Sequence, residues 1–107
     1  IRQVVALGGG TPMIRAARAR IEQAQRAGRG MVVYLKCEVR ELARRLREAP
    51  GDRPSLTGAD PSEEVARVLA EREATYLAVA DIVFETTHGS PADAATRLAA
   101  MLAGKSP

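Results

Sequence analysis

The residues of this sequence that could do chemistry are a run of glycines and a few arginines set far from it along the chain. Gly8, Gly9 and Gly10 directly follow the apolar residues 4–7. Glycine has no side chain, so a ligand can approach its backbone closely, and ligands of open α/β sheets bind where the strands end. The run is therefore a candidate floor of a substrate site. The alternative is a plain tight turn, because three glycines by themselves fix no chemistry.

Arg72 is informative because it interrupts an apolar stripe. It lies between Val65 and Tyr76, at a spacing that places all three on one face of an expected helix. Burying a guanidinium without an anionic partner costs several kcal/mol, so Arg72 should have a partner. That partner is either a carboxylate of the protein, in a structural ion pair, or an anionic ligand.

Arg53 lies in a segment, residues 49–59, that has no periodicity and contains two prolines and two glycines. Because the next residue is Pro54, the backbone at Arg53 should be extended and its side chain should project from the loop. Loops of this length often act as lids, and a lid cation reaches a phosphate only when the site closes. Arg53 is therefore a candidate catalytic residue on a lid of about residues 49–60. The alternative is a solvated loop arginine.

The composition indicates an anionic ligand. Of the 16 basic residues, 14 are arginine, and the formal net charge is +3. Arginine's planar fork suits carboxylates and phosphates, although many of these side chains could simply cover solvated helix faces. Nucleic acid is a poor candidate partner, because an aromatic content of 3% leaves little to stack on bases and the arginines alternate with acids.

The remaining reactive residue types point to no further chemistry. Cys37 is the single cysteine, so we expect no internal disulfide, a reducing cytoplasm and a small buried side chain at a strand end. His88 is the single histidine, and without a second ligand at metal-binding spacing it is expected to be a surface loop residue. We therefore predict no metal site here. The sequence also has no long apolar run, so we expect no membrane span.

These residues must be positioned by an alternation of strands and helices. Apolar runs predict three buried strands, and apolar stripes with cap and proline signals predict four helices. This alternation is typical of an α/β fold with a parallel sheet. The expected strands are residues 4–7, 31–35 and 82–85. The expected helices are residues 11–27, with Thr11 as the cap and Gly28 as a left-handed end, residues 39–46, residues 61–80 after the cap Asp60, and a last helix capped by Ser90 that begins at Pro91.

Five motifs in this order resemble the C-terminal two-thirds of a shikimate kinase. The resemblance covers nearly all 107 residues, and the order and spacing of the motifs make it more specific than any one of them. The motifs are VVALGGG at 4–10, VVYL at 32–35, RRL at 44–46, RPSLTG at 53–58 and EREATY at 71–76, followed by ADI at 80–82.

The resemblance implies a P-loop kinase-like, three-layer α/β/α fold with a parallel sheet, of which this chain holds part. It also implies transfer of the ATP γ-phosphate to the 3-hydroxyl of shikimate, with Mg²⁺, in aromatic amino-acid biosynthesis. The glycine turn and Arg72 match the family's shikimate-binding residues, with Arg72 on the carboxylate. Arg53 matches the lid arginine that reaches the phosphates. On the nucleotide side, the matching residues are Arg45, which packs on adenine, and Ser90 and Pro91.

The sequence departs from the family by what it lacks. A P-loop needs a Gly-x-x-x-x-Gly-Lys-Ser/Thr run, and none is present. In the family this loop comes earlier in the chain and its strand is central in the sheet. We therefore expect these residues to be part of a longer chain that is a cytoplasmic monomer, and to be inactive alone. The alternative is a non-catalytic ligand-binding domain of the same fold, such as the sensor of a transcriptional regulator.

Overall fold

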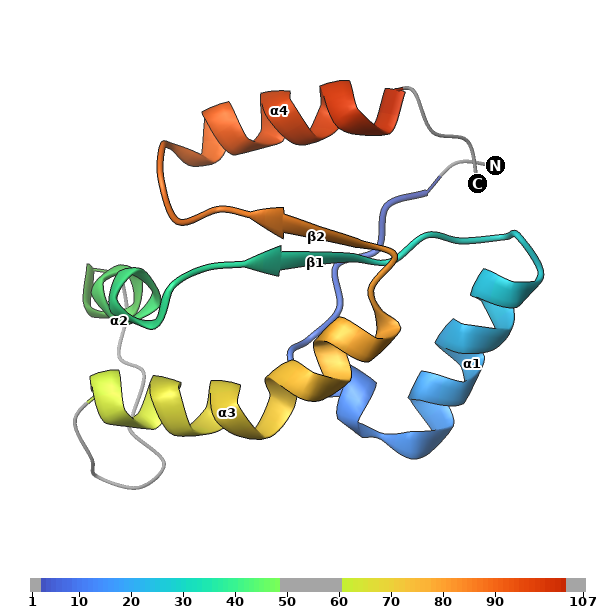
Figure 1. Cartoon of the computed structure of the whole chain (residues 1–107), viewed down its shortest axis with the longest axis horizontal. Coiled ribbons are helices and arrows are strands. Elements are labelled where there is room, and N and C mark those ends of the chain that lie inside the picture. The colour runs from blue at the N-terminus through green and yellow to red at the C-terminus, as the bar shows by residue number, and fades with distance from the viewer. Residues whose placement is uncertain (1–2, 49–60, 104–107) are drawn as a thin grey trace.

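The chain folds as alternating helices and strands (Figure 1). A computed structural model describes residues 3–48 and 61–103. The elements are the 3₁₀ helix η1 (Thr11–Met13), α1 (Arg15–Arg26), β1 (Val33–Lys36), α2 (Val39–Glu48), α3 (Pro61–Val79), β2 (Ile82–Glu85) and α4 (Pro91–Ala103). The four predicted α-helices and two of the three predicted strands are present. No helix in the described ranges is long and apolar enough to cross a bilayer.

Strands β1 and β2 pair in parallel, with Val33 opposite Ile82 and Lys36 opposite Glu85. Alternate residues of a strand face opposite sides of the sheet. Tyr34 faces α3, where its ring centroid lies 5.2 Å from that of Tyr76. Phe84 faces the other side, where the guanidinium carbon of Arg97 in α4 lies 5.2 Å from its ring centroid. The sheet is thus the middle of three layers, which confirms the predicted α/β/α class (Figure 1).

The third predicted strand, residues 4–7, is not formed. These residues have no regular secondary structure, and Val4 and Val5 are 97% and 64% exposed. A strand is held by hydrogen bonds to a neighbouring strand. The described sheet contains only β1 and β2, and neither pairs with residues 4–7. Apolar, β-branched residues therefore do not make a strand here, because no ladder holds their backbone.

The first predicted helix begins later than expected. Thr11 was expected to cap it, but Thr11 starts η1, whose cap is Gly10 and makes no side-chain bond. Ile14 then has an extended backbone (φ −83°, ψ 118°), which interrupts the helical path before α1. The predicted end is confirmed: Gly28 has φ of 70°, and the N–H of Arg29 donates to the carbonyl of Ala24 at 2.9 Å.

A hydrogen-bonded link ties the beginnings of the two strands to the end of α1. Asp81 Oδ2 accepts from the backbone N–H of Val32 at 2.7 Å and from Gln25 Nε2 at 2.8 Å. The N–H of Asp81 donates in return to the carbonyl of Val32 at 2.8 Å. This reciprocal pair sets the register of the sheet at its entry, so the strand ends that follow are also aligned.

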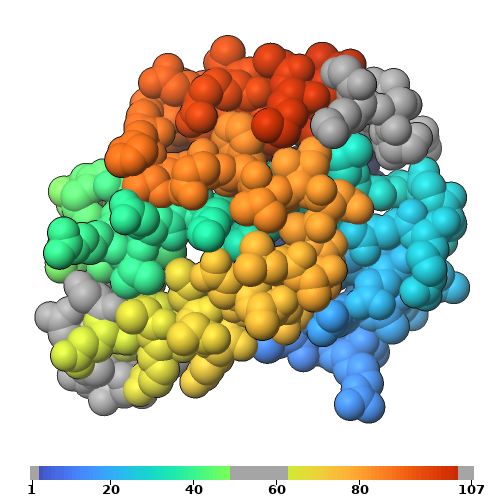
Figure 2. All heavy atoms as spheres, viewed as in Figure 1, coloured from blue at the N-terminus to red at the C-terminus, as the bar shows by residue number. Residues whose placement is uncertain are grey.

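The buried core is small. Four apolar residues are less than a tenth exposed, and Cys37, at the end of β1, is one of them, as predicted. Figure 2 shows the red atoms of α4 on one side of the molecule and the yellow atoms of α3 on the other. The buried apolar residues are Cys37, Ala43, Val79 and Phe84.

Candidate functional site

The glycine run forms a closed turn. The N–H of Thr11 donates to the carbonyl of Gly8 at 3.0 Å, and Gly10 has φ of −84° and ψ of −12°. Among the described residues, positive φ occurs only at Gly28 and Gly89. The backbone angles of this turn are therefore open to residues with side chains, and they do not explain why glycine is present.

The neighbours of Gly9 do explain it. A Cβ added at Gly9 would lie 3.1 Å from Nη1 of Arg72 and 3.2 Å from the hydroxyl of Tyr76. At Gly10 the nearest atom would be Nη2 of Arg72, at an ordinary 3.8 Å. The Tyr76 hydroxyl also donates to the carbonyl of Gly9 at 2.6 Å. Two side chains of α3 thus lie directly against the turn, and Gly9 leaves the space they need.

Arg72 has its guanidinium at this turn, and no partner for it lies among the described residues. The residue is half-buried, and within residues 3–48 and 61–103 no carboxylate or carbonyl is bonded to it. The N–H groups of Gly9 and Gly10 likewise have no acceptor among the described residues. The arrangement therefore places unpaired hydrogen-bond donors and one positive charge side by side, which suits a small anion.

The predicted nucleotide-side residues form a second group, on α2 and at the start of α4. Arg45 Nη2 donates to the carbonyl of Thr86 at 2.6 Å, and its Nε donates to Glu41 Oε1 at 3.2 Å. The Arg45 side chain remains 38% exposed, so part of it is open to solvent.

Ser90 and Pro91 stand at the start of α4. Ser90 Oγ accepts from the N–H of Asp93 at 3.1 Å, as the capping pattern predicted. Its hydroxyl is therefore engaged by its own helix. Arg53 and the predicted lid of residues 49–60 lie outside the described residues.

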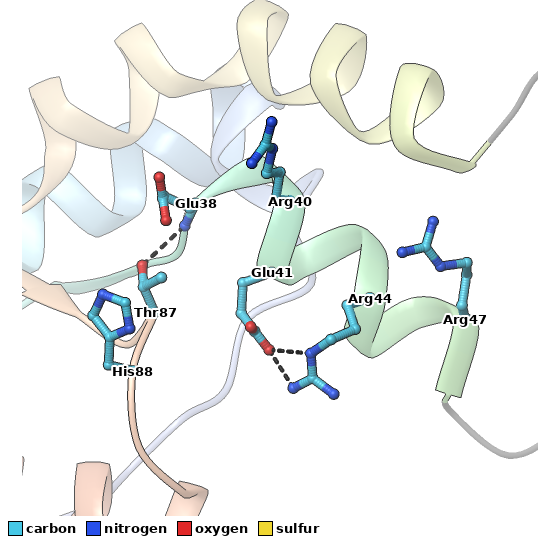
Figure 3. Close-up of a pocket in the computed structure, with 7 residues that line it drawn as sticks. All are labelled: Glu38, Arg40, Glu41, Arg44, Arg47, Thr87 and His88. Carbon is cyan, nitrogen blue, oxygen red and sulfur yellow. Dashed lines mark hydrogen bonds and ion pairs between the residues drawn. The ribbon is translucent and has the colours of Figure 1, made fainter.

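A charged cleft of about 440 Å³ lies beside this second group. Figure 3 shows that one side of it comes from α2 and the other from the loop after β2. Its lining residues are Glu38, Arg40, Glu41, Arg44, Arg47, Thr87 and His88. None of the glycines, Arg72 or Arg45 lines it, so the cleft and the glycine turn are separate features.

Ion pairs balance part of the charge in this cleft. Arg44 Nε donates to Glu41 at 2.9 Å, and Arg44 Nη1 donates to Glu48 at 2.6 Å. The hydrogen bond from Arg44 lowers the pKa of Glu41, and the nearby charge of Arg45 adds to this effect. The same bonds raise the pKa of Arg44. Both groups therefore stay ionised at neutral pH.

The loop after β2 is fixed by a second small network. Thr87 is buried, and its hydroxyl accepts from the N–H of Glu38 at 3.0 Å and bonds to the Glu85 carboxylate. The hydrogen bond from Thr87 lowers the pKa of Glu85. His88, predicted to be a surface loop residue, is exposed and lines the cleft. The described residues contain no group of three or more His, Cys, Asp or Glu that could hold a metal ion.

Sequence reasoning missed the place of Tyr76 in this site. The sequence predicts that Tyr76 lies in the apolar stripe with Val65, and it indicates no hydrogen bond to the glycine turn. Its spacing contained a signal, because Tyr76 lies one helical turn after Arg72 and therefore on the same face. A tyrosine at that position can reach whatever the arginine reaches.

Comparison with known proteins shows what the chain is similar to. The family model for shikimate kinase matches residues 2–103. The chain is 39% identical over 102 residues to shikimate kinase 2 of Pectobacterium carotovorum, which covers 94% of the chain and 56% of the relative. It is 48% identical over 86 residues to shikimate kinase 2 of Sodalis glossinidius, which covers 78% of the chain and 47% of the relative.

The fold and the family match together define the class: the chain belongs to the shikimate kinase family. It spans about half the length of the curated relatives that it matches. The same proportion holds for shikimate kinase 2 of Yersinia pestis, which is 39% identical over 106 residues, covering 97% of the chain and 58% of the relative.

Proposed function

We propose that this chain carries the shikimate-binding turn and part of the nucleotide site of a shikimate kinase. The observation that supports this most directly is the guanidinium of Arg72 beside Gly9 and Gly10, which has no partner within the described part of the chain. Shikimate is a small hydroxylated ring acid. Its carboxylate would accept from Arg72, and the backbone N–H groups of the turn would face the same ligand. A charge-assisted bond of this kind is roughly twice as strong as a neutral one.

On the nucleotide side, Arg45, Ser90 and Pro91 would border the adenine of ATP, and Arg53 would reach the transferring phosphates from the lid. Arg45 is partly exposed and would stack on a planar base, with its guanidinium held by the hydrogen bond to Thr86. The hydroxyl of Ser90 accepts from Asp93 as the cap of α4, and its own proton would remain available to donate toward the adenine.

Phosphoryl transfer needs positioning and charge stabilisation more than covalent chemistry from the protein. The residues of this chain would hold the acceptor through Arg72 and the glycine turn, and Arg53 would bring positive charge to the phosphates on closure. Mg²⁺, when bound with ATP, would neutralise charge on the phosphates. Because the described residues offer no cluster of metal ligands, we assign none of them to it. A cytoplasmic monomer remains our expectation for the whole protein.

The test is ATP-dependent phosphorylation of shikimate by the full-length protein, with two arginine variants of α3. Arg72→Ala should raise the KM for shikimate by at least about tenfold, since a charged hydrogen bond is worth about 1.5–3 kcal/mol. Arg67→Ala is the matched control, because Arg67 is exposed on the same helix and its loss changes the net charge equally. It should leave the KM unchanged.

Two results would count against the proposal. Equal KM values for the Arg72→Ala variant and the wild type would remove Arg72 from the shikimate site. Tight shikimate binding without phosphoryl transfer would instead favour a non-catalytic ligand-binding domain of the same fold.

A further inference from the structure

We infer that Tyr76 is a positioning residue that orients the Gly9–Gly10 peptide toward the acceptor substrate. This inference rests on the proposed function, because it concerns the same glycine turn. Tyr76 would not touch the substrate. Its hydroxyl would fix the backbone group that does.

The orientation of the Gly10 N–H follows from the geometry of the peptide bond. The Tyr76 hydroxyl donates to the carbonyl of Gly9 at 2.6 Å. In a trans peptide, the carbonyl of one residue and the N–H of the next point in opposite directions. Holding the Gly9 carbonyl on the Tyr76 hydroxyl therefore directs the N–H of Gly10 away from that hydroxyl. That N–H has no acceptor among the described residues, so it remains available to a ligand.

The Gly9–Gly10 peptide needs such a bond because glycine is flexible. Gly9 and Gly10 have no Cβ, and such residues can turn their peptide planes at little steric cost. The bond from Thr11 to Gly8 closes the turn but does not engage the Gly9–Gly10 peptide. Among the described residues, the hydrogen bond from the Tyr76 hydroxyl is the only one that this peptide makes. Without it, the amide would sample several orientations, and ligand binding would have to select one.

The ring of Tyr76 is held separately from its hydroxyl. It packs against Tyr34 of β1, with ring centroids 5.2 Å apart and an interplanar angle of 52°. The hydroxyl of Tyr34 is buried and has no hydrogen-bond partner within the described residues. Two neighbouring tyrosines thus differ in one respect: the hydroxyl of Tyr76 bonds to the glycine turn, and that of Tyr34 bonds to nothing described.

This difference supplies a matched pair of variants in the full-length protein. Tyr76→Phe and Tyr34→Phe each remove one hydroxyl and keep the ring. We expect Tyr76→Phe to raise the KM for shikimate by about fivefold, the equivalent of one ordinary hydrogen bond, and to leave the KM for ATP unchanged. Tyr34→Phe should change neither constant.

A second readout needs no ligand. In ¹⁵N-labelled protein, Tyr76→Phe should move and broaden the amide signal of Gly10, whereas Tyr34→Phe should leave it in place. A purely structural role would instead lower the thermal midpoint and leave both the shikimate KM and this signal unchanged. Gly9→Ala disturbs the same contact from the backbone side, and it should move the Gly10 signal even if Tyr76→Phe folds poorly.

The outcomes separate this inference from the proposed function. If wild-type protein phosphorylates shikimate and Tyr76→Phe retains both the wild-type KM and the Gly10 signal, the positioning role is overturned and the proposed function stands. If wild-type protein neither binds nor phosphorylates shikimate, the proposed function fails. The substrate part of this inference fails with it, while the Gly10 signal still tests the hydrogen bond.

Discussion

At the scale of single residues, Gly9 is favoured by what approaches it and not by its own backbone angles. Arg72 and Tyr76 occupy the space that a Cβ would need, at 3.1 and 3.2 Å. Gly8 differs, because a Cβ there would meet only Thr11 Oγ1 at 3.5 Å, an ordinary contact. The three glycines of the run are therefore not equivalent.

We predict that Gly9→Ala displaces the guanidinium of Arg72, whereas Gly8→Ala does not. Contacts under about 3.4 Å to a new methyl group force the flexible ends of the neighbouring side chains to move. The measurement is the side-chain Nε signal of Arg72 in ¹⁵N-labelled protein. A shift in the Gly9→Ala variant alone is expected, and equal shifts in the two variants would show that crowding is not specific to Gly9.

Part of this residue-level account was accessible from sequence. The apolar stripe around Arg72 predicted that its guanidinium would need a partner, and the structure shows no protein group filling that need within the described chain. The bond from Tyr76 to Gly9 was not predicted, because it joins residues 67 apart in the chain. Local periodicity predicts the helix face on which a side chain lies. It does not predict which distant carbonyl that side chain contacts.

At the scale of elements, α2 carries a glutamate that holds two arginines. Glu41 accepts from Arg44 and Arg45, and Arg45 also reaches Thr86 after β2. Glu41 and the Thr86 carbonyl therefore hold the Arg45 side chain from two sides. The hydrogen bond from Arg44 lowers the pKa of Glu41 below its ordinary value.

This lowered pKa predicts how stability responds to acid. The folded-state pKa of Glu41 lies below the unfolded one, so its stabilising contribution is complete above the ordinary glutamate pKa of about 4.3. The contribution is lost as the pH falls through the folded-state pKa. Thermal unfolding from pH 7 down to pH values below about 4 should therefore show a smaller loss of midpoint for Glu41→Gln than for wild type.

The control for this experiment is Glu71→Gln, an exposed glutamate of α3 for which the described residues show no ion pair. It should retain the wild-type acid response. An acid response of Glu41→Gln equal to that of wild type would contradict the account of this network.

The helices and the later strands were predictable because each has a strong local signal. Ser90 and Asp93 form the expected cap of α4, and Gly28 ends α1 with the expected left-handed angle. Residues 4–7 failed as a strand because strand formation depends on a neighbour, which local sequence does not contain. The predicted start of the first helix was wrong because Ile14 has an extended backbone, which its residue type does not indicate.

At the scale of the whole molecule, the described part of the fold has a two-stranded sheet and an apolar segment beside it that no ladder holds. Val4, Val5 and Leu7 are all exposed, and Leu35 of β1 is 57% exposed. Apolar side chains that stay exposed to water contribute little to stability, because they bury little surface on folding. The order of the molecule therefore rests on the β1–β2 pair and the helices against it.

Hydrogen exchange should reveal this division in a protein consisting of residues 1–107. We expect the amides of residues 4–7 to exchange with little protection, because no hydrogen-bonded strand covers them. The amides of Ile82 and Thr86 should be protected, since they donate to the carbonyls of Val32 and Lys36 at 3.1 and 2.7 Å. Slow exchange at residues 4–7 in a verified monomer would contradict this description.

The central claim is that Arg72 binds a carboxylate at the glycine turn, and one thermodynamic cycle tests it most directly. Shikimate and its methyl ester would be titrated into full-length wild-type protein and into the Arg72→Ala variant. The ester keeps the ring and hydroxyls and removes the charge. In the wild type, esterification should weaken binding by about tenfold or more, whereas the variant should bind the two compounds with the same low affinity. An equal loss on esterification in the two proteins would show that the carboxylate is bound elsewhere.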